Sequence, residues 1–271
     1  MMINQSDKAE VTVTDPWQQI KSFTRARIAL GRAGSSLPTR EVLDFGLSHA
    51  MARDAVHLAL DVEALAQRLE SLGLSTIQLQ SKAQDRATYL LRPDLGRQLS
   101  QQSADHLSAL RLSKPISLLI VIGDGLSSLA VERHVRPLLE EIQQQMPADW
   151  SMNPLVIVSQ ARVAVADEIG ERLGATMTAI LIGERPGLSS PDSLGIYLTY
   201  HPKAGLNDAN RNCISNIRPE GLGYTAAAKK MIWLTKEAMR LKVSGVALKD
   251  ESDVLEIGEM PLKKLNSKDS V

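Results

Sequence analysis

Three polar segments whose side chains can do chemistry each follow a short apolar run of the sequence. Gly-Glu-Arg-Pro-Gly at 183–187 follows the run 177–182 and supplies a carboxylate and a guanidinium. Gly-Asp-Gly-Leu-Ser-Ser at 123–128 and the pair Arg162-Val163 follow two earlier apolar runs. Ligands of open α/β sheets bind beyond the carboxyl ends of the strands. If the apolar runs are strands, these segments predict a ligand site at one edge of a sheet.

A plainer interpretation stays open for each candidate. The segment 183–187 also fits a polar turn with a surface Glu-Arg pair, and 123–128 also fits the N-cap turn of a helix. The latter lacks the third glycine of a dinucleotide fingerprint and the Gly-Lys-Ser/Thr ending of a phosphate loop. No Gly-x-Ser-x-Gly elbow surrounds Ser127. Cys213 fits a nucleophile, a ligand contact or, most often for lone cysteines, a small core residue.

The composition excludes several classes of protein. Of the 271 residues, 44% are apolar and 23% are charged, as in ordinary soluble globular proteins. A formal net charge of zero and only 3% aromatic residues provide neither a basic surface nor stacking platforms for nucleic acid. Cys213 is the single cysteine, which excludes an internal disulfide, and the five histidines lack zinc-ligand spacing.

The sequence also predicts where the protein is found. The N-terminus lacks the pattern of a signal peptide. No apolar run approaches the roughly 20 residues that a membrane-spanning helix needs. We therefore expect a soluble cytoplasmic protein with no bound metal, no nucleic-acid partner and no membrane association.

Residues 113–249 alternate between short apolar runs and helical patterns. Strands are predicted at 117–122, 155–158, 177–182, 195–200 and 214–217. Helices are predicted from 128 to 142, from 165 to 173 and from 225 to about 242. Continuous apolar runs are typical of strands that helices cover on both faces. The alternation predicts an α/β fold with a Rossmann-like, mainly parallel sheet.

The residues before 113 predict a smaller, mainly helical domain over 21–112, preceded by a flexible arm at 1–20. Helical periodicity begins near residue 20, and further helices are predicted at 39–60, at 61–72 and from 92 onward. Candidate strands lie at 76–80, as a strand or a hairpin arm, and at 88–91. The charged, aperiodic residues 250–271 predict a flexible C-terminal tail.

Five short motifs occur in a fixed order along the chain. They are Arg-Ile-Ala-Leu-Gly-Arg-Ala-Gly at 27–34, Tyr-Leu-Leu-Arg-Pro-Asp-Leu-Gly-Arg at 89–97, Asp-Gly-Leu-Ser at 124–127, the segment 183–187, and Cys-Ile-Ser-Asn-Ile at 213–217. Over residues 21–249 the chain resembles the small (light) subunit of ethanolamine ammonia-lyase, an adenosylcobalamin-dependent bacterial enzyme.

This resemblance implies a function and a partner. The family's enzyme converts ethanolamine to acetaldehyde and ammonia by radical chemistry, and the substrate site lies in a separate large subunit. The resemblance thus implies a hetero-oligomer in which this chain carries no catalytic residue. It also implies that Val163, Glu184 and Cys213 contact cobalamin. The residue types fit, since a corrin ring needs apolar contact and its amide side chains need acceptors.

The chain departs from the family pattern in two places. Ala161 stands where members often have glycine before the Arg-Val pair. Many members also carry an N-terminal amphipathic helix that directs them into a bacterial microcompartment, and no clear apolar stripe occurs in the first twenty residues here. We therefore expect a free cytoplasmic enzyme. The alternative function is a stand-alone α/β ligand-binding protein, and a hydrolase using Ser127 or Cys213 is disfavoured because no base is placed.

Overall fold

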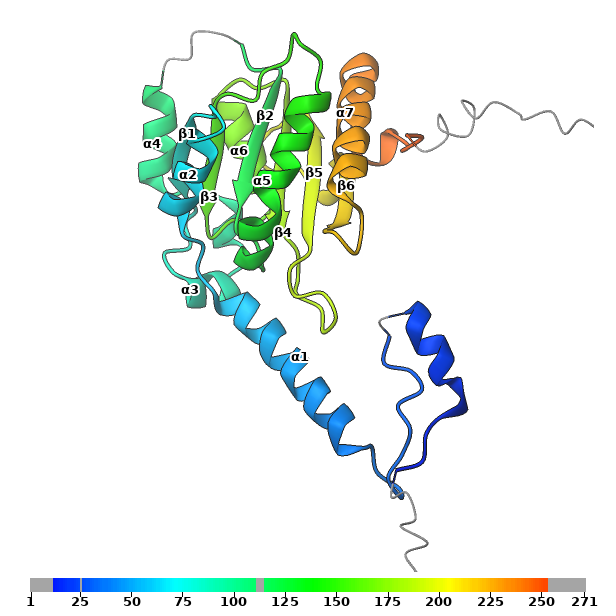
Figure 1. Ribbon diagram of the computed structural model, residues 1–271. Coiled ribbons are helices and arrows are strands. Elements are labelled where there is room, and N and C mark those ends of the chain that lie inside the picture. Colours follow the sequence, from blue (N-terminus) through cyan, green and yellow to red (C-terminus); the bar gives the residue numbers. More distant parts are fainter. Residues whose placement is uncertain (1–11, 25, 111–114, 253–271) are drawn as a thin grey trace, which may run out of the picture.

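A six-stranded sheet forms the centre of the computed structural model, which describes residues 12–24, 26–110 and 115–252 (Figure 1). Its strands are β1 (Thr76–Gln80), β2 (Leu118–Gly123), β3 (Leu155–Ser159), β4 (Met177–Gly183), β5 (Leu194–Tyr200) and β6 (Arg211–Ile217). They lie in the order β1-β3-β2-β4-β5-β6. The first four run parallel to one another, and β5 and β6 join by antiparallel pairing.

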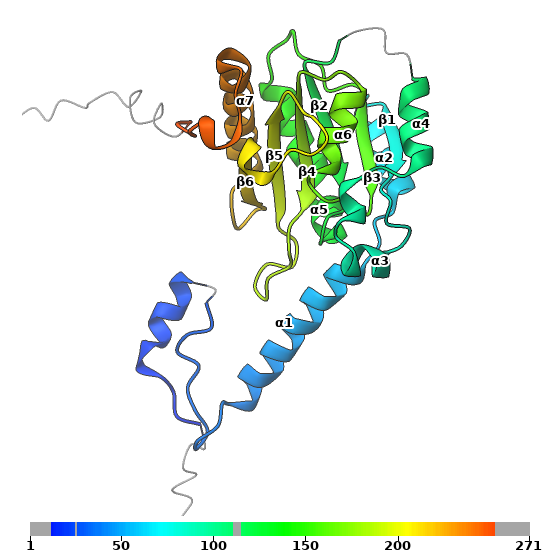
Figure 2. The same ribbon diagram turned by 180° about the vertical axis from the view of Figure 1, so that it is seen from behind.

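Helices cover both faces of this sheet, as Figures 1 and 2 show. The α-helices of the described residues are α1 (Thr39–His57), α2 (Val62–Glu70), α3 (Arg86–Leu91), α4 (Gln101–Ala109), α5 (Ser128–Gln145), α6 (Val165–Arg172) and α7 (Tyr224–Leu241). The 3-10 helices are η1 (Pro16–Phe23), η2 (Leu95–Arg97), η3 (Asp208–Asn210) and η4 (Gly245–Ala247). One core lies between the sheet and α2, α5 and α7, and the other lies under α4 and α6.

Side-chain alternation along β2 explains why its sequence is apolar throughout. Leu118, Ile120 and Ile122 belong to the first core, and Leu119 and Val121 belong to the second. Successive residues of a strand point to opposite faces, so a strand covered on both sides has no solvent-facing position. All six residues of β2 are buried. The predicted α/β class and the mainly parallel sheet are confirmed, and the Rossmann-like detail stays a prediction.

Three expectations for the N-terminal third are wrong. Residues 88–91 are helical in α3, because the carboxylate of Asp85 accepts the N–H of Thr88 at 2.8 Å and caps the helix. The helix predicted from residue 92 forms only as the three-residue 3-10 helix η2, and the next α-helix, α4, begins after its cap residue Ser100. The helix predicted from near residue 20 to the loop at 31–36 is instead the 3-10 helix η1, which begins at Pro16 and ends at Phe23.

The segment 76–80 is β1, an edge strand parallel to β3, so the hairpin-arm alternative is wrong. Residues of the predicted N-terminal domain therefore contribute a strand to the sheet of the predicted α/β domain. The predicted boundary at 112–113 lies at residues outside the described ranges, and the two-domain organisation stays a prediction. The predicted arm at 1–20 and tail at 250–271 also lie largely outside those ranges.

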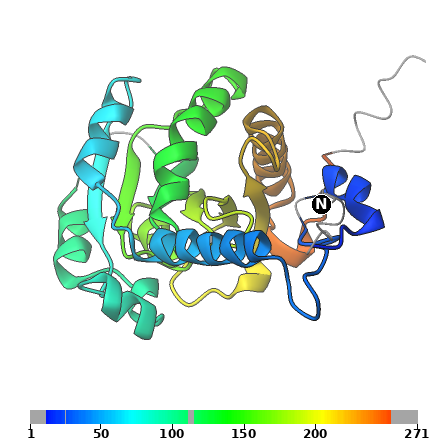
Figure 3. The ribbon, with the colours of Figure 1, turned by 60° about the horizontal axis from the view of Figure 1, so that its bottom comes forward.

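The chain before α2 extends away from the sheet (Figures 1 and 2). Helix α1 begins its projection at the end of the sheet where the parallel strands finish, and in Figure 3 it is seen in front of that end. Ala55 is the buried residue of this 19-residue helix. Within the described ranges, no helix combines the length and the apolar character that crossing a membrane requires.

Candidate ligand-binding site

The strand order reverses direction at the neighbouring strands β2 and β4, which makes this place the topological switch point of the sheet. The chain leaves β2 for β3 on one side and then crosses back to β4 on the other side of β2. Open α/β sheets bind ligands beyond the carboxyl ends of the strands at such a switch point. Here the loop 124–127 follows β2, and Glu184 follows β4.

Two glycines let the loops after β2 and β4 touch. Gly125 has φ +59°, and a Cβ at this position would lie 2.2 Å from the carbonyl oxygen of Gly183. A Cβ on Gly183 would lie 2.0 Å from the carbonyl oxygen of Ser127. The N–H of Leu126 donates to the Gly183 carbonyl at 2.9 Å. Only glycine fits both positions, since any side chain would separate the two backbones.

A pocket of 410 Å³ opens beside this contact. It is lined by Tyr89, Gly125, Leu126, Arg162, Val163, Ile182, Gly183, Glu184, Arg185 and Tyr197. Val163 and Glu184 come from the loops after β3 and β4, so two of the three predicted contact residues share one pocket. The pocket combines apolar side chains with a carboxylate and guanidinium groups, as ligand sites commonly do.

Glu184 is held in place by its own loop and by β6. Its carboxylate oxygen Oε2 accepts from the hydroxyl of Ser193 at 2.5 Å and from the N–H of Asn216 at 3.2 Å. The Glu184 N–H donates to the carbonyl of Ser193 at 2.9 Å. Within the described residues no hydrogen bond reaches the other carboxylate oxygen, Oε1. Glu184 therefore keeps a fixed position and one acceptor atom for a ligand donor.

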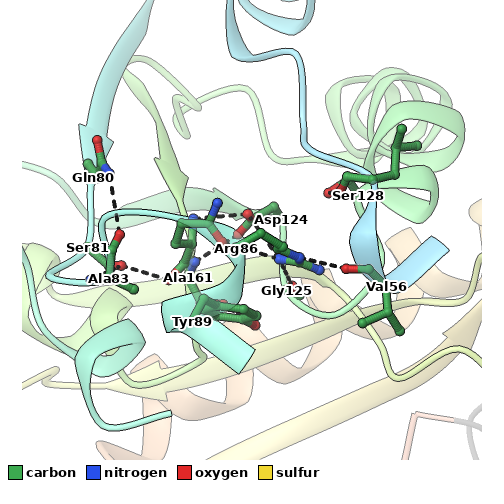
Figure 4. Close-up of polar contacts among 12 residues, drawn as sticks. Val56, Gln80, Ser81, Ala83, Arg86, Tyr89, Asp124, Gly125, Ser128 and Ala161 are labelled. Atoms are coloured by element: carbon green, nitrogen blue, oxygen red, sulfur yellow. Dashed lines mark hydrogen bonds and ion pairs between the residues drawn. The ribbon is translucent and has the colours of Figure 1, made fainter. Parts of the chain in front are cut away.

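A buried carboxylate ties the loop after β2 to the loop after β3 (Figure 4). Asp124 accepts the N–H groups of Gln160 at 2.9 Å and Ala161 at 2.8 Å, and it pairs with Arg86 at 3.4 Å. Burial raises the pKa of Asp124, and the Ala161 N–H and the Arg86 guanidinium oppose that change. Arg86 also donates to the carbonyls of Gly125 at 2.8 Å and Val56 at 2.6 Å.

Tyr89 forms the floor on which the arginines stack. The guanidinium carbon of Arg162 lies 4.3 Å from the centre of the Tyr89 ring, and that of Arg86 lies 4.7 Å from it. The Tyr89 hydroxyl donates to the carbonyl of Ala161 at 3.0 Å. Cation–π contacts of this kind strengthen when solvent is excluded, and Tyr89 is fully buried. The ring therefore fixes Arg162 at the wall of the pocket.

Most of the chain is similar in sequence to known proteins. A sequence model described as ethanolamine ammonia-lyase light chain (EutC) matches residues 14–249. The chain belongs to this family. Relatives named ethanolamine ammonia-lyase small subunit from Ralstonia nicotianae and Azotobacter vinelandii are each 56% identical, over 257 residues (93% of this chain, 95% of the relative) and 252 residues (92% and 93%). One from Pseudomonas fluorescens is 55% identical over 251 residues, 92% of each chain.

In this member of the ethanolamine ammonia-lyase light-chain family, Cys213 lies beside the pocket rather than in its lining. It sits on β6 opposite Tyr197, which does line the pocket, and its side chain is exposed. The core interpretation of Cys213 is therefore wrong. Desolvation raises the pKa of the Cys213 thiol, and the nearby charge of Glu184 acts in the same direction. A neutral thiol is a poor nucleophile, which argues against the hydrolase interpretation.

Ser127 has a structural role in this light-chain fold. Its hydroxyl donates to the carbonyl of Pro191 at 2.8 Å and accepts the N–H of Ala130 at 3.3 Å, so it caps α5. The side chain is fully buried. The N-cap interpretation of 123–128 is confirmed, while Gly125 and Leu126 of the same segment line the pocket.

Sequence reasoning missed Arg86 and Tyr89 as residues that build the site. Both lie in α3, of which the sequence presented residues 88–91 as a candidate strand. The available signal was Asp85, a cap residue that would have marked the start of a helix. No local pattern indicates that this helix packs under the loops after β2 and β3, about 40 and 70 residues later in the chain, since that placement depends on the sheet order.

Proposed function

We propose that this chain is the small subunit of ethanolamine ammonia-lyase and that it supplies one wall of a cobalamin site. A large subunit carries the substrate site and the residues that act on ethanolamine. One observation carries the proposal: in a chain of this family, Val163 and Glu184 meet in a single pocket at the switch point of the sheet, with Cys213 beside it.

The residues of the pocket fit a corrinoid. Val163 offers apolar contact for a ring, and Oε1 of Glu184 offers an acceptor for amide N–H groups. The Nε atom of Arg162 is buried and has no hydrogen-bond partner among the described residues, so a ligand carbonyl or phosphate oxygen would satisfy it. When bound, adenosylcobalamin supplies the radical chemistry that begins the deamination of ethanolamine to acetaldehyde and ammonia.

The size of the pocket supports a shared site. At 410 Å³ it suits a drug-sized ligand and holds only part of a corrinoid with its nucleotide arm. A second chain must therefore cover the rest of the cofactor. A stand-alone chain that bound this cofactor would leave most of it in solvent, so the stand-alone alternative requires a smaller ligand. We also propose that the complex is free in the cytoplasm rather than enclosed in a microcompartment.

The test is co-expression of this chain with its large subunit, followed by an acetaldehyde assay with ethanolamine. We expect activity only when both chains and adenosylcobalamin are present. Activity from either chain alone, or no complex between the two chains, would contradict the proposal.

The role of Glu184 is tested separately by the variants Glu184→Ala and Glu184→Gln. Glu184→Ala removes an acceptor at the pocket wall, so we expect cobalamin to dissociate about tenfold more readily from the assembled complex. Glu184→Gln keeps an acceptor oxygen and should fall between that variant and the unchanged protein. Retention is measured from the visible absorbance of the complex after gel filtration. Unchanged retention in Glu184→Ala would overturn this assignment.

A further inference from the structure

The exposed apolar surface of this chain is concentrated before the sheet begins. Of the sixteen large apolar side chains that are exposed among the described residues, twelve lie between residues 13 and 58. They are Val13, Trp17, Ile20, Phe23, Ile28, Leu37, Val42, Leu43, Phe45, Leu47, Met51 and Leu58. Scattered exposed apolar residues are ordinary, but a concentration on one projecting segment marks an interaction surface.

Helix α1 presents apolar side chains on two sides. Leu43 and Leu47 are four residues apart and share one side of the helix, with exposures of 66% and 61%. Val42 and Phe45 share a side about 150° around the axis, with exposures of 52% and 48%. A helix that is apolar on opposite sides is normally enclosed rather than laid on a flat surface. Within this chain, α1 buries Ala55 alone.

The base of α1 is fixed to the candidate cofactor site. The carbonyl of Val56 accepts from Arg86 at 2.6 Å, and Arg86 in turn pairs with Asp124 (Figure 4). The carbonyl of Leu58 accepts from the hydroxyl of Ser128 at 2.8 Å. These hydrogen bonds anchor the C-terminal end of α1 at the end of the sheet that holds the pocket.

The segment before α1 also faces the loop that begins at Glu184. A hollow of 380 Å³ lies between them, lined by Arg27 and Leu30 before α1, by Met51 on α1, and by Leu188 and Pro191 of the loop. The exposed apolar segment is therefore continuous with the side of the protein on which a second chain must cover the cofactor.

We propose that residues 12–57, here called the docking arm, hold the large subunit, and that α1 inserts into a groove of that subunit. This inference rests on the proposed function. Stable interfaces use roughly 20–30 residues on each side, and the docking arm is longer than that. A helix that exposes apolar side chains on two sides can bury both of them only when a groove of the partner encloses it. The large subunit is thus held chiefly by the docking arm, and the pocket contributes the cofactor contacts.

Two pairs of substitutions test the two sides of α1. Leu43→Gln with Leu47→Gln, and Val42→Gln with Phe45→Gln, replace exposed apolar residues by a good helix former. The matched control is Leu241→Gln with Val246→Gln, which removes exposed apolar side chains at the end of α7 and in η4. Each protein is co-expressed with a tagged large subunit, and its affinity is measured after purification. We expect each α1 pair to weaken association about tenfold or more, and the control to leave it unchanged.

The outcomes separate this inference from the proposed function. If the unchanged chain does not bind the large subunit, both are overturned. If the unchanged chain binds and supports cobalamin-dependent activity, and both double variants of α1 bind as tightly as it does, only the proposal that the docking arm holds the large subunit is overturned. If only one pair weakens binding, α1 contacts the large subunit on one side only, and the proposed insertion into a groove is overturned. An isolated chain that forms a dimer broken by the α1 pairs, with unchanged binding to the large subunit, would make a second copy the occupant and overturn the proposal.

Hydrogen exchange gives a second readout that does not depend on a variant. The amide N–H groups of α1 are compared in the isolated chain and in the complex. We expect at least tenfold slower exchange over residues 39–57 in the complex, because burial suppresses local opening of the helix. Unchanged exchange over this range in a formed complex would overturn the proposal.

Discussion

Gly125 and Gly174 share a left-handed backbone conformation but differ in what surrounds them. Their φ values are +59° and +65°. A Cβ on Gly125 would collide with the backbone of Gly183, whereas a Cβ on Gly174 would meet nothing within 4 Å. Substitution of Gly174 therefore measures the free-energy cost of the positive φ alone. Substitution of Gly125 adds the cost of pushing apart the backbones of Gly125 and Gly183.

We expect Gly125→Ala to lower the free energy of unfolding by about 2–4 kcal/mol, because strain in φ adds to displacement of the β4 backbone. Gly174→Ala should cost only about 1–2 kcal/mol, the strain in φ alone. Urea unfolding of both variants measures the difference. Equal losses would show that the loops after β2 and β4 can separate at no cost.

At the scale of elements, a buried histidine joins two helices and a loop. Nδ1 of His134 on α5 lies 2.8 Å from the hydroxyl of Tyr224 on α7. Its Nε2 lies 3.5 Å from the carboxylate of Asp192 in the β4–β5 loop, and that carboxylate also pairs with Arg133. Burial lowers the pKa of His134 from 6.5, although Asp192 opposes the change.

This lowered pKa predicts a loss of stability in acid. Between the folded pKa of His134 and 6.5, the unfolded chain binds more protons than the folded chain, so the free energy of unfolding falls as pH falls below 6.5. The contribution is at most about 1.4 kcal/mol per pH unit. His134→Gln should remove it. Urea unfolding of both proteins at several pH values between 5 and 8 measures it, and a constant difference between them would contradict the prediction.

At the scale of the whole molecule, the docking arm and the sheet differ in how much they bury. Removal of residues 1–52 takes no buried side chain from the described residues. We expect the shortened chain to keep its melting temperature within a few degrees. Thermal unfolding followed by circular dichroism measures this, and a large drop would show that the arm packs on the sheet.

Removal of residues 1–112 tests whether residues 113–249 form a domain of their own. This cut removes β1 and the buried Leu65, Leu69 and Leu107, which belong to the two cores. Each buried leucine contributes about 1.5–3 kcal/mol, and a domain is stable by only about 5–15 kcal/mol in total. We expect this fragment not to fold. A cooperative thermal transition in it would support two independent domains.

Local patterns in the sequence were sufficient for the α/β part of the chain. The apolar runs at 117–122, 155–158 and 177–182 predicted β2, β3 and β4 to within a residue or two at each end. The polar segments after them predicted the edge at which the pocket lies. These predictions succeeded because a strand buried on both faces needs an uninterrupted apolar run, and this constraint acts on neighbouring residues.

The sequence by itself determined the fold class, the strands β2 to β6, the family resemblance and the edge at which Val163 and Glu184 meet. Only the tertiary structure decided that β1 joins this sheet, that Arg86 and Tyr89 support the pocket, that Cys213 lies beside it, and that α1 stands free of the sheet. The reason is physical: the pattern of buried residues in a strand or helix is visible within a short stretch of sequence. Strand order and helix packing depend on contacts between segments far apart in the chain.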